Sequence, residues 1–203
     1  MSKARKSTPK GITVKVRNIT ESEMCLEIGN VDTYFVNALR RILLAEIPTM
    51  AAETLRVVKN TTIVQDEMIA HRLGLIPLRA TEDALMSTDV GMSLSFECQE
   101  DEPVSVYAKD LELSDGIEVA CGDILLAKMT RGQELVIEVD CRKGTGREHC
   151  KWSPVCHAGF RPTDKARTYI FNIETVGSMT PDDAFLASLK ILEEKFTLTK
   201  KLS

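Results

Sequence analysis

The sequence predicts an α+β protein in which two strands and a helix open the chain, a strand-rich segment fills the middle, and a strand and a long helix close it. Residues 11–28 alternate apolar and polar side chains twice, as strands with one buried face do. Apolar helical spacing is found at residues 31–48 and again at 180–203. Because the segment between these helices has mostly strand-like patterns, it reads as an insertion between two ends of one unit.

Composition sets broad limits on function. The chain has 203 residues, enough for one sizeable domain or two small ones. Its 43% hydrophobic and 28% charged content is ordinary for a soluble globular protein, and a net charge of -4 argues against wide coverage of nucleic-acid phosphates. Residues 1–10 are basic and lack core formers, which predicts a frayed tail. No secretory signal or long apolar run is present, so we expect an intracellular protein with no membrane span.

The opening helix is the most distinctive element of the sequence. Asp32 is the expected N-cap, and Pro48 should end the helix near Ile47. Apolar side chains cover this helix almost all round, except at Arg40 and Arg41. Two interpretations stay open: a buried helix whose arginines extend to solvent, or a helix buried by its own domain on one side and a partner on another, with the arginines facing a second partner.

The middle of the chain reads as extended segments around one short helix. Residues 52–64 look β-like, and a helix at 66–74 has Asp66 as its expected cap and Gly74 at its end. The tract 81–91 looks polar and irregular. Four further strands are expected at 93–98, 104–108, 124–128 and 135–140, followed by a basic, glycine-containing loop at 141–154.

A strand at 169–173 and a capped helix close the chain. Thr180 is the expected N-cap, with Pro181 at the first helical position and two acidic residues in the first turn. The helix carries an apolar seam at spacings of four, three and four residues, like that of a coiled coil: Phe185, Leu189, Leu192 and Phe196.

No catalytic motif is present. The sequence lacks a Gly-x-Ser-x-Gly nucleophile elbow, a phosphate-binding loop and a His-Glu-x-x-His zinc motif. The six cysteines form no Cys-x-x-Cys pair, and most are expected to be small core residues. His149–Cys150 with Cys156–His157 is the best metal candidate, but adjacent donors suit zinc poorly. An enzyme with a zinc site there is one alternative function.

The basic loop offers a second alternative. Its cations and single indole resemble a single-strand nucleic-acid platform, but Arg and Trp are also typical of protein–protein contacts. Gly144 and Gly146 are expected to adopt unusual backbone torsions in a tight loop. The residues of this candidate patch are Arg142, Lys143, Arg147, Lys151 and Trp152.

Three segments together resemble one protein family. They are NALRRILLAEIP at 37–48, HRLGLIP at 71–77 and GREHCKW at 146–152. These look like the signature segments of the alpha-like assembly subunits of multisubunit DNA-directed RNA polymerases. The Gly-x-Glu-His-x-Lys-Trp segment is more similar to the archaeal D-type subunit and the third-largest subunit of eukaryotic RNA polymerase II than to bacterial alpha. The resemblance covers nearly the whole chain in the same order.

The resemblance implies a fold and a role. It implies a discontinuous dimerisation domain at residues 11–48 and 155–203, with an inserted mainly-β domain at 49–154. It further implies a non-catalytic, structural subunit for transcription, which forms a heterodimer with a small L-like (eleventh-subunit-like) subunit and docks the beta-like second-largest subunit. Small zinc-ribbon-type polymerase subunits are further expected partners.

The same resemblance assigns expected contact residues. The dimer interface would consist of apolar side chains on the two helices: Phe35, Ala38, Leu39, Ile42, Phe185, Leu189, Leu192 and Phe196. The contact with the beta-like subunit would come from the three signature segments: Asn37, Arg40, Arg41, His71, Arg72, Glu148, His149, Lys151 and Trp152.

Three departures from the family pattern limit what is carried over. The tract 81–91 has no cysteine where relatives carry a zinc loop or an iron–sulfur domain, so no metal or cofactor is expected. The DNA-binding C-terminal domain of bacterial alpha has no counterpart, so no direct sequence-specific DNA contact is implied. The chain is also shorter than typical cellular relatives. Nucleus, cytoplasm and the virion of a large DNA virus therefore stay open as locations.

Overall fold

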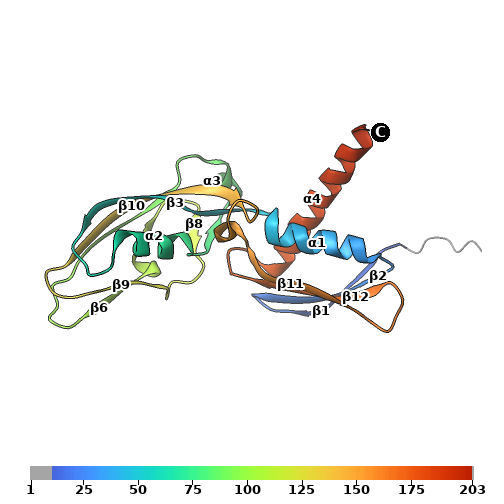
Figure 1. Cartoon of the computed structure of the whole chain (residues 1–203), viewed down its shortest axis with the longest axis horizontal. Coiled ribbons are helices and arrows are strands. Elements are labelled where there is room, and N and C mark those ends of the chain that lie inside the picture. Colours follow the sequence, from blue (N-terminus) through green and yellow to red (C-terminus); the bar gives the residue numbers. More distant parts are fainter. Residues whose placement is uncertain (1–10, 203) are drawn as a thin grey trace, which may run out of the picture.

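The computed structural model describes residues 11–202, and within them two sheet-containing units lie end to end (Figure 1). The terminal unit is built from both ends of the chain. Its elements are β1 (Thr13–Ile19), β2 (Glu23–Gly29), α1 (Thr33–Ala45), β11 (Val155–Pro162), β12 (Thr168–Thr175) and α4 (Pro181–Leu202). The middle unit contains β3 (Pro48–Asn60), α2 (Asp66–Gly74), β4 (Leu78–Ala80), α3 (Glu82–Met86), β5 (Gly91–Glu97), β6 (Val104–Tyr107), β7 (Glu112–Leu113), β8 (Ile117–Val119), β9 (Leu125–Met129) and β10 (Glu134–Thr145). The α+β class is confirmed.

The terminal unit is one antiparallel sheet with helices on one face. Its strand order is β1-β2-β12-β11, so the last strands of the chain pair with the first. β2 directs Met24, Leu26 and Ile28 into the core, where they meet buried side chains of α1 and α4. Because the sheet presents an apolar face and each helix an apolar stripe, packing them together removes both from water.

The middle unit has a separate core. Its main sheet has the order β3-β10-β5-β7, and two small sheets pair β4 with β8 and β6 with β9. α2 packs against β3 and β9 through its buried Ile69 and Leu73. β3 and β10 pair along their whole length, from Asn60 with Leu135 to Pro48 with Thr145, and this long ladder reaches the terminal unit.

The prediction that the first strand is half-buried is wrong. Val14 and Val16 are 48% and 59% exposed. They pair with Ile28 and Leu26, which are buried, so all four side chains lie on the helix-bearing face of the sheet. β1 is the edge strand, and α1 and α4 do not cover it. The apolar side chains of β1 therefore form a strip that adjoins the core of the terminal unit but is exposed to solvent.

Local details of the middle unit also differ from the sequence-based expectations. β3 ends at Asn60 rather than near Val64, because the Asn60 side chain bonds to the Thr62 amide and the Val64 carbonyl and turns the chain. The cap of α2 is Gln65, and Asp66 is the first helical residue. The tract predicted to be irregular contains α3, whose N-cap Thr81 accepts a hydrogen bond from Ala84 N.

Half of the cysteines are not core residues. Cys98 and Cys141 are buried, Cys25 is half-buried, and Cys121, Cys150 and Cys156 are exposed. Among residues 11–202, no helix is both long and apolar enough to cross a membrane.

Candidate protein-contact surfaces

The loop that follows β10 closes against the end of α1. Arg147 N donates a hydrogen bond to the Ala45 carbonyl at 2.9 Å, and the Ser153 hydroxyl donates to the carbonyls of Leu44 at 3.0 Å and Val155 at 2.9 Å, which share its one proton. The bonds to Leu44 and Ala45 satisfy carbonyls of the last turn of α1, which have no partner inside the helix. Two of the family-like segments, 37–48 and 146–152, therefore lie in contact although about a hundred residues separate them in the chain.

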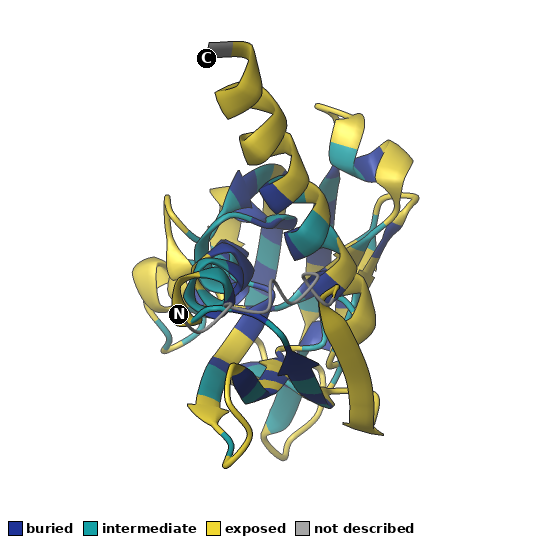
Figure 2. Ribbon diagram, turned by 90° about the vertical axis from the view of Figure 1, so that its right-hand side faces the viewer, coloured by how far each residue is buried: buried dark blue, intermediate teal, exposed yellow. Residues whose placement is uncertain are grey.

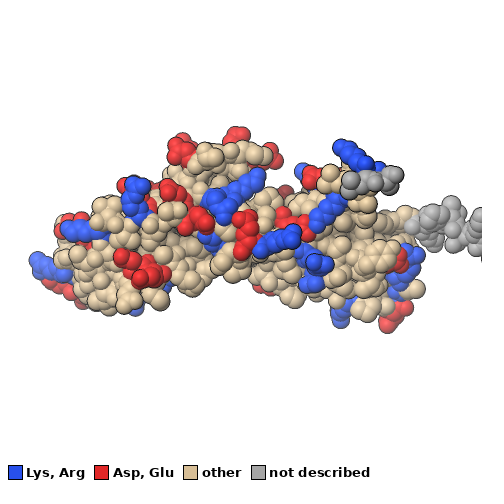
Figure 3. Space-filling view, turned by 45° about the horizontal axis from the view of Figure 1, so that its top comes forward, with Lys and Arg blue, Asp and Glu red and all other residues tan. Residues whose placement is uncertain are grey.

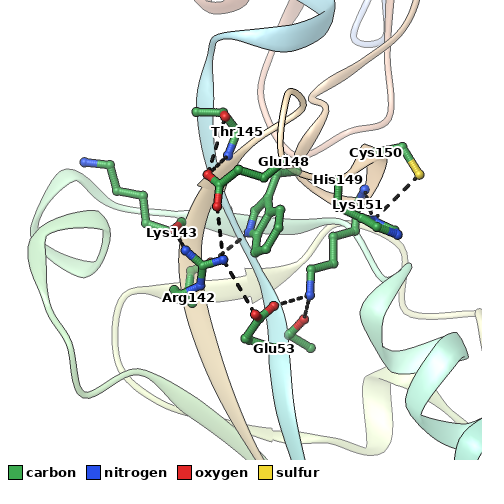
Figure 4. A network of polar contacts seen from close by, with 10 residues as sticks. Glu53, Arg142, Lys143, Thr145, Glu148, His149, Cys150 and Lys151 are labelled. Carbon is green, nitrogen blue, oxygen red and sulfur yellow. Dashed lines mark hydrogen bonds and ion pairs between the residues drawn. The ribbon is translucent and has the colours of Figure 1, made fainter.

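We call the contact between the end of α1 and the loop at residues 146–153 the junction. Trp152 is a core residue of this junction. Its side chain is 3% exposed, and its indole N–H donates to the Arg142 carbonyl at 2.9 Å. The Arg142 guanidinium and the Lys151 ammonium lie 4.6 and 4.3 Å from the centre of the ring (Figure 4). The prediction that Trp152 contacts a partner is therefore wrong for its side chain. A buried indole cannot serve as a stacking platform for nucleic-acid bases either.

Two carboxylates neutralise the cations beside the indole. Glu53 on β3 pairs with Lys151 and, at 3.6 Å, with Arg142, which also pairs with Glu148 at 3.2 Å (Figure 4). Lys151 donates in addition to the Ala52 carbonyl at 2.8 Å. Glu148 and Lys151, both predicted to contact a partner, are thus engaged within the chain. The hydrogen bond from Lys151 is the main reason that the pKa of Glu53 lies below its ordinary value of 4.5.

This pKa shift predicts a pH-dependent contribution to stability. Because the pKa of Glu53 is lower in the folded than in the unfolded chain, the contribution is complete above the ordinary value and is lost as pH falls through the folded value. Glu53 is partly exposed, so solvent screening limits the contribution to about 1 kcal/mol or less. In chemical denaturation, the free energy of unfolding should fall less between about pH 6 and pH 3 in Lys151→Met than in the parent. Equal slopes would contradict this role.

Gly144 and Gly146 are needed for close packing rather than for unusual torsions. Neither has a positive φ, so that prediction is wrong. A Cβ on Gly144 would lie 2.4 Å from the ring of Trp152, and one on Gly146 would lie 2.3 Å from the Leu44 carbonyl oxygen. The junction therefore closes because two glycines leave out a side chain.

Gly144→Ala is expected to destabilise the fold by about 1–3 kcal/mol, because the new methyl group displaces a buried indole. A denaturation midpoint at fixed pH measures the loss. Gly74→Ala is the matched control, since a Cβ at Gly74 meets nothing within 4 Å. Equal stability of the two variants would show that the indole moves aside freely.

The second half of α1 presents cations at the same junction. Arg40 Nε donates to the Asn37 amide oxygen at 3.1 Å and is half-buried, whereas Arg41 is exposed. Within residues 11–202, no ion pair includes Arg41, Lys143 or Arg147. Cations and acids alternate across the middle of this face (Figure 3).

His149 is exposed in the same loop, and its Nδ1 accepts a hydrogen bond from Lys151 N at 3.1 Å. Its neighbour Cys150 lies with Sγ 3.8 Å from that nitrogen, while Cys156 Sγ donates to the Glu174 carbonyl on the adjoining strand. In the described part of the chain, no three His, Cys, Asp or Glu side chains come together to hold a metal ion.

The two predicted contact residues on α2 have different roles. His71 is exposed, between exposed Met68 and Leu75. Arg72 instead turns inward and donates to the Leu125 and Leu126 carbonyls of β9 at 3.1 and 3.0 Å. The guanidinium therefore attaches α2 to β9, while the side chain is half-buried, and its assignment as a partner contact stays a prediction.

The predicted dimer residues divide into core and surface. Leu39 and Ile42 are 0% and 2% exposed, so their assignment to an interface is corrected. Phe185 and Leu192 are 8% exposed and pack mainly inside the terminal unit, but Leu192 also lines the groove described below, so the assignment of these two stays a prediction. Phe35, Ala38 and Leu189 are half-buried, and Phe196 is 59% exposed. A groove of about 340 Å³ runs between α1 and α4, lined by Phe35, Leu189, Leu192, Glu193, Phe196, Thr197 and Lys200.

Comparison with known proteins identifies the family of this chain. The family model described as the RNA polymerase Rpb3/Rpb11 dimerisation domain matches residues 26–196. DNA-directed RNA polymerase subunit Rpo3 of Methanocaldococcus jannaschii is 35% identical over 161 residues, covering 79% of this chain and 80% of that protein. Subunit RPAC1 of DNA-directed RNA polymerases I and III of Saccharomyces cerevisiae is 26% identical, covering 92% of this chain and 86% of that protein. The chain belongs to the RNA polymerase Rpb3/Rpb11 dimerisation-domain family, the alpha-like assembly subunits of multisubunit DNA-directed RNA polymerase.

Proposed function

We propose that this chain is a non-catalytic assembly subunit that first forms a heterodimer with a small L-like subunit and then docks the beta-like second-largest subunit of the polymerase. The observation that carries the first step is the position of α4. Its second half extends beyond the sheet of the terminal unit (Figures 1 and 2), and residues 193–201 are all exposed. Such a helix end, with Phe196 uncovered, is stabilised when a partner covers it.

The edge strand supports the same step. The apolar strip on β1 lies on the helix-bearing face of the terminal sheet. A partner that contributes helices of its own could cover both the groove between α1 and α4 and this strip. The uncovered apolar side chains of the strip are Ile12, Val14, Val16 and Ile19. Burial of such surface is the main favourable term in obligate association.

The junction supports the docking step. Arg41, Lys143 and Arg147 present positive charge for which the described chain supplies no carboxylate. An acidic surface on the second-largest subunit would complement it, and arginine suits such contacts because its planar group binds carboxylates through two hydrogen bonds. Asn37 supports this surface by fixing the Arg40 side chain. The chain would work wherever the polymerase works, the nucleus of a eukaryote or the cytoplasm of a prokaryote.

Chemical cross-linking of the purified assembly tests both contacts. Lysine-directed reagents should connect Lys190 on α4 to the small partner and Lys143 at the junction to the second-largest subunit, since the two lysines lie on different units of the chain. Cross-links from Lys143 to the small partner alone would contradict the proposed division of surfaces.

A further inference from the structure

The turn that follows α1 is where three parts of the chain meet. Glu46, the C-cap residue of α1, forms an ion pair with Lys195 of α4 at 2.5 Å. The loop after β10 binds the carbonyls of Leu44 and Ala45 through Ser153 and Arg147. β3 begins at Pro48, directly after buried Ile47.

Further contacts continue the connection into the middle unit. The Thr49 hydroxyl donates to the Trp152 carbonyl at 2.7 Å, and this threonine is buried. On β4, Arg79 Nε donates to the Gly177 carbonyl at 2.8 Å, in the segment between β12 and α4. Within residues 11–202, the chain passes between the units only through the segments around Ile47 and Ser153, and two such connections alone would allow a hinge. The additional hydrogen bonds oppose that motion.

We propose that this turn is a fixed joint, in which Gly146 and Ser153 are positioning residues that hold α1 in one orientation relative to the β3–β10 ladder. Gly146 brings the loop within contact of Leu44, and Ser153 bonds to the same carbonyl. Both residues therefore act on the turn itself and carry no charge that could bind a partner directly. The effect on docking rests on the proposed function. The charges of α1 and of the loop form one surface only while the joint is closed, and a preformed surface avoids the cost of ordering on binding.

The heterodimer should depend much less on the joint. The groove between α1 and α4 and the strip on β1 lie within the terminal unit and involve no residue of the middle unit. Loosening the joint therefore separates the two steps of assembly, since it weakens docking and spares dimerisation.

Distance measurement between spin labels tests the joint directly. One label is placed on Cys121 in the middle unit and one on a cysteine introduced by Asp164→Cys in the turn between β11 and β12, both exposed positions. Cys25, Cys150 and Cys156 are replaced by serine so that they take no label, and Cys98 and Cys141 are buried. The complete chain with its small partner should give one narrow distance distribution. Gly146→Ala should broaden it, because the added methyl group displaces the loop, while Gly74→Ala should leave it narrow.

Ser153 provides a gentler variant in case Gly146→Ala does not fold. Ser153→Ala should broaden the distribution, and Ser153→Thr, which keeps the hydroxyl, should restore it.

Gly146→Ala and Ser153→Ala should also bind the second-largest subunit about tenfold more weakly, with unchanged affinity for the small subunit. Narrow distributions in both Gly146→Ala and Ser153→Ala would overturn the joint. Broad distributions with full recruitment would overturn its link to docking. If Arg41→Ala also left recruitment intact, the proposed docking surface would be wrong. The distance distributions would still show whether the two units are held in one orientation.

Discussion

Phe196→Asp is expected to abolish heterodimer formation while leaving the chain folded. Phe196 is 59% exposed, so the fold of the isolated chain gains little from it. In the proposed interface the aspartate would be buried without a partner cation, which costs several kcal/mol. We therefore expect affinity for the small subunit to fall by more than about 100-fold, as for a central residue of an interface. Analytical ultracentrifugation of the co-expressed subunits measures the loss.

Leu198→Asp is the matched control for this prediction. Leu198 is 60% exposed and lies two residues further along α4, on the side that faces away from the groove. The substitution adds the same charge to the same helix, and the heterodimer should largely survive it. Loss of the complex in Leu198→Asp with retention in Phe196→Asp would place the interface on the opposite side of α4.

Arg41→Ala is expected to weaken recruitment of the second-largest subunit and to leave the heterodimer intact. The side chain is exposed, and no ion pair in residues 11–202 depends on it, so its removal should not disturb the fold. If its guanidinium bonds a carboxylate in the assembly, truncation should cost roughly 2 kcal/mol, or about 30-fold in affinity. Titration of the purified heterodimer with the second-largest subunit measures this difference.

Arg56→Ala controls for a general effect of lost charge. Arg56 is exposed on β3 and pairs with Glu138 on the surface of the middle unit, away from the junction. Its removal should leave recruitment unchanged. Equal weakening by both substitutions would mean that recruitment responds to net charge rather than to a contact at Arg41, and unfolding of Arg41→Ala would show that the arginine is structural.

The helices α1 and α4 were the most predictable part of the fold. Asp32 is the N-cap of α1, as predicted, although its carboxylate pairs with Arg167 and accepts a bond from Tyr34 instead of capping the helix. The acidic first turn of α4 is likewise where the sequence predicts it. Such signals are local, because caps and dipoles act within one turn. The burial of β1 could not be predicted, since it depends on how far α1 and α4 extend across the sheet.

The junction was predictable in its residues but not in its contacts. The family resemblance pointed to residues 146–152, yet which side chains face inward follows from pairing between β3 and β10. Apolar and polar side chains alternate as far as Cys141 and Arg142, but Lys143 and Gly144 break the pattern, so periodicity alone does not extend the strand to Thr145. The contact of Gly144 with Trp152 arises from tertiary packing, so the glycines were assigned to turns. The hydrogen bonds of Arg72 were missed for the same reason, because the carbonyls that it binds lie on β9.

The native mass of the smallest stable complex recovered with the tagged chain from its natural source tests the assembly role most directly. We predict a 1:1 complex with a small subunit that also carries apolar helices, contained in a larger assembly with two very large chains. A lone monomer, or a symmetric homodimer without large partners, would contradict that role.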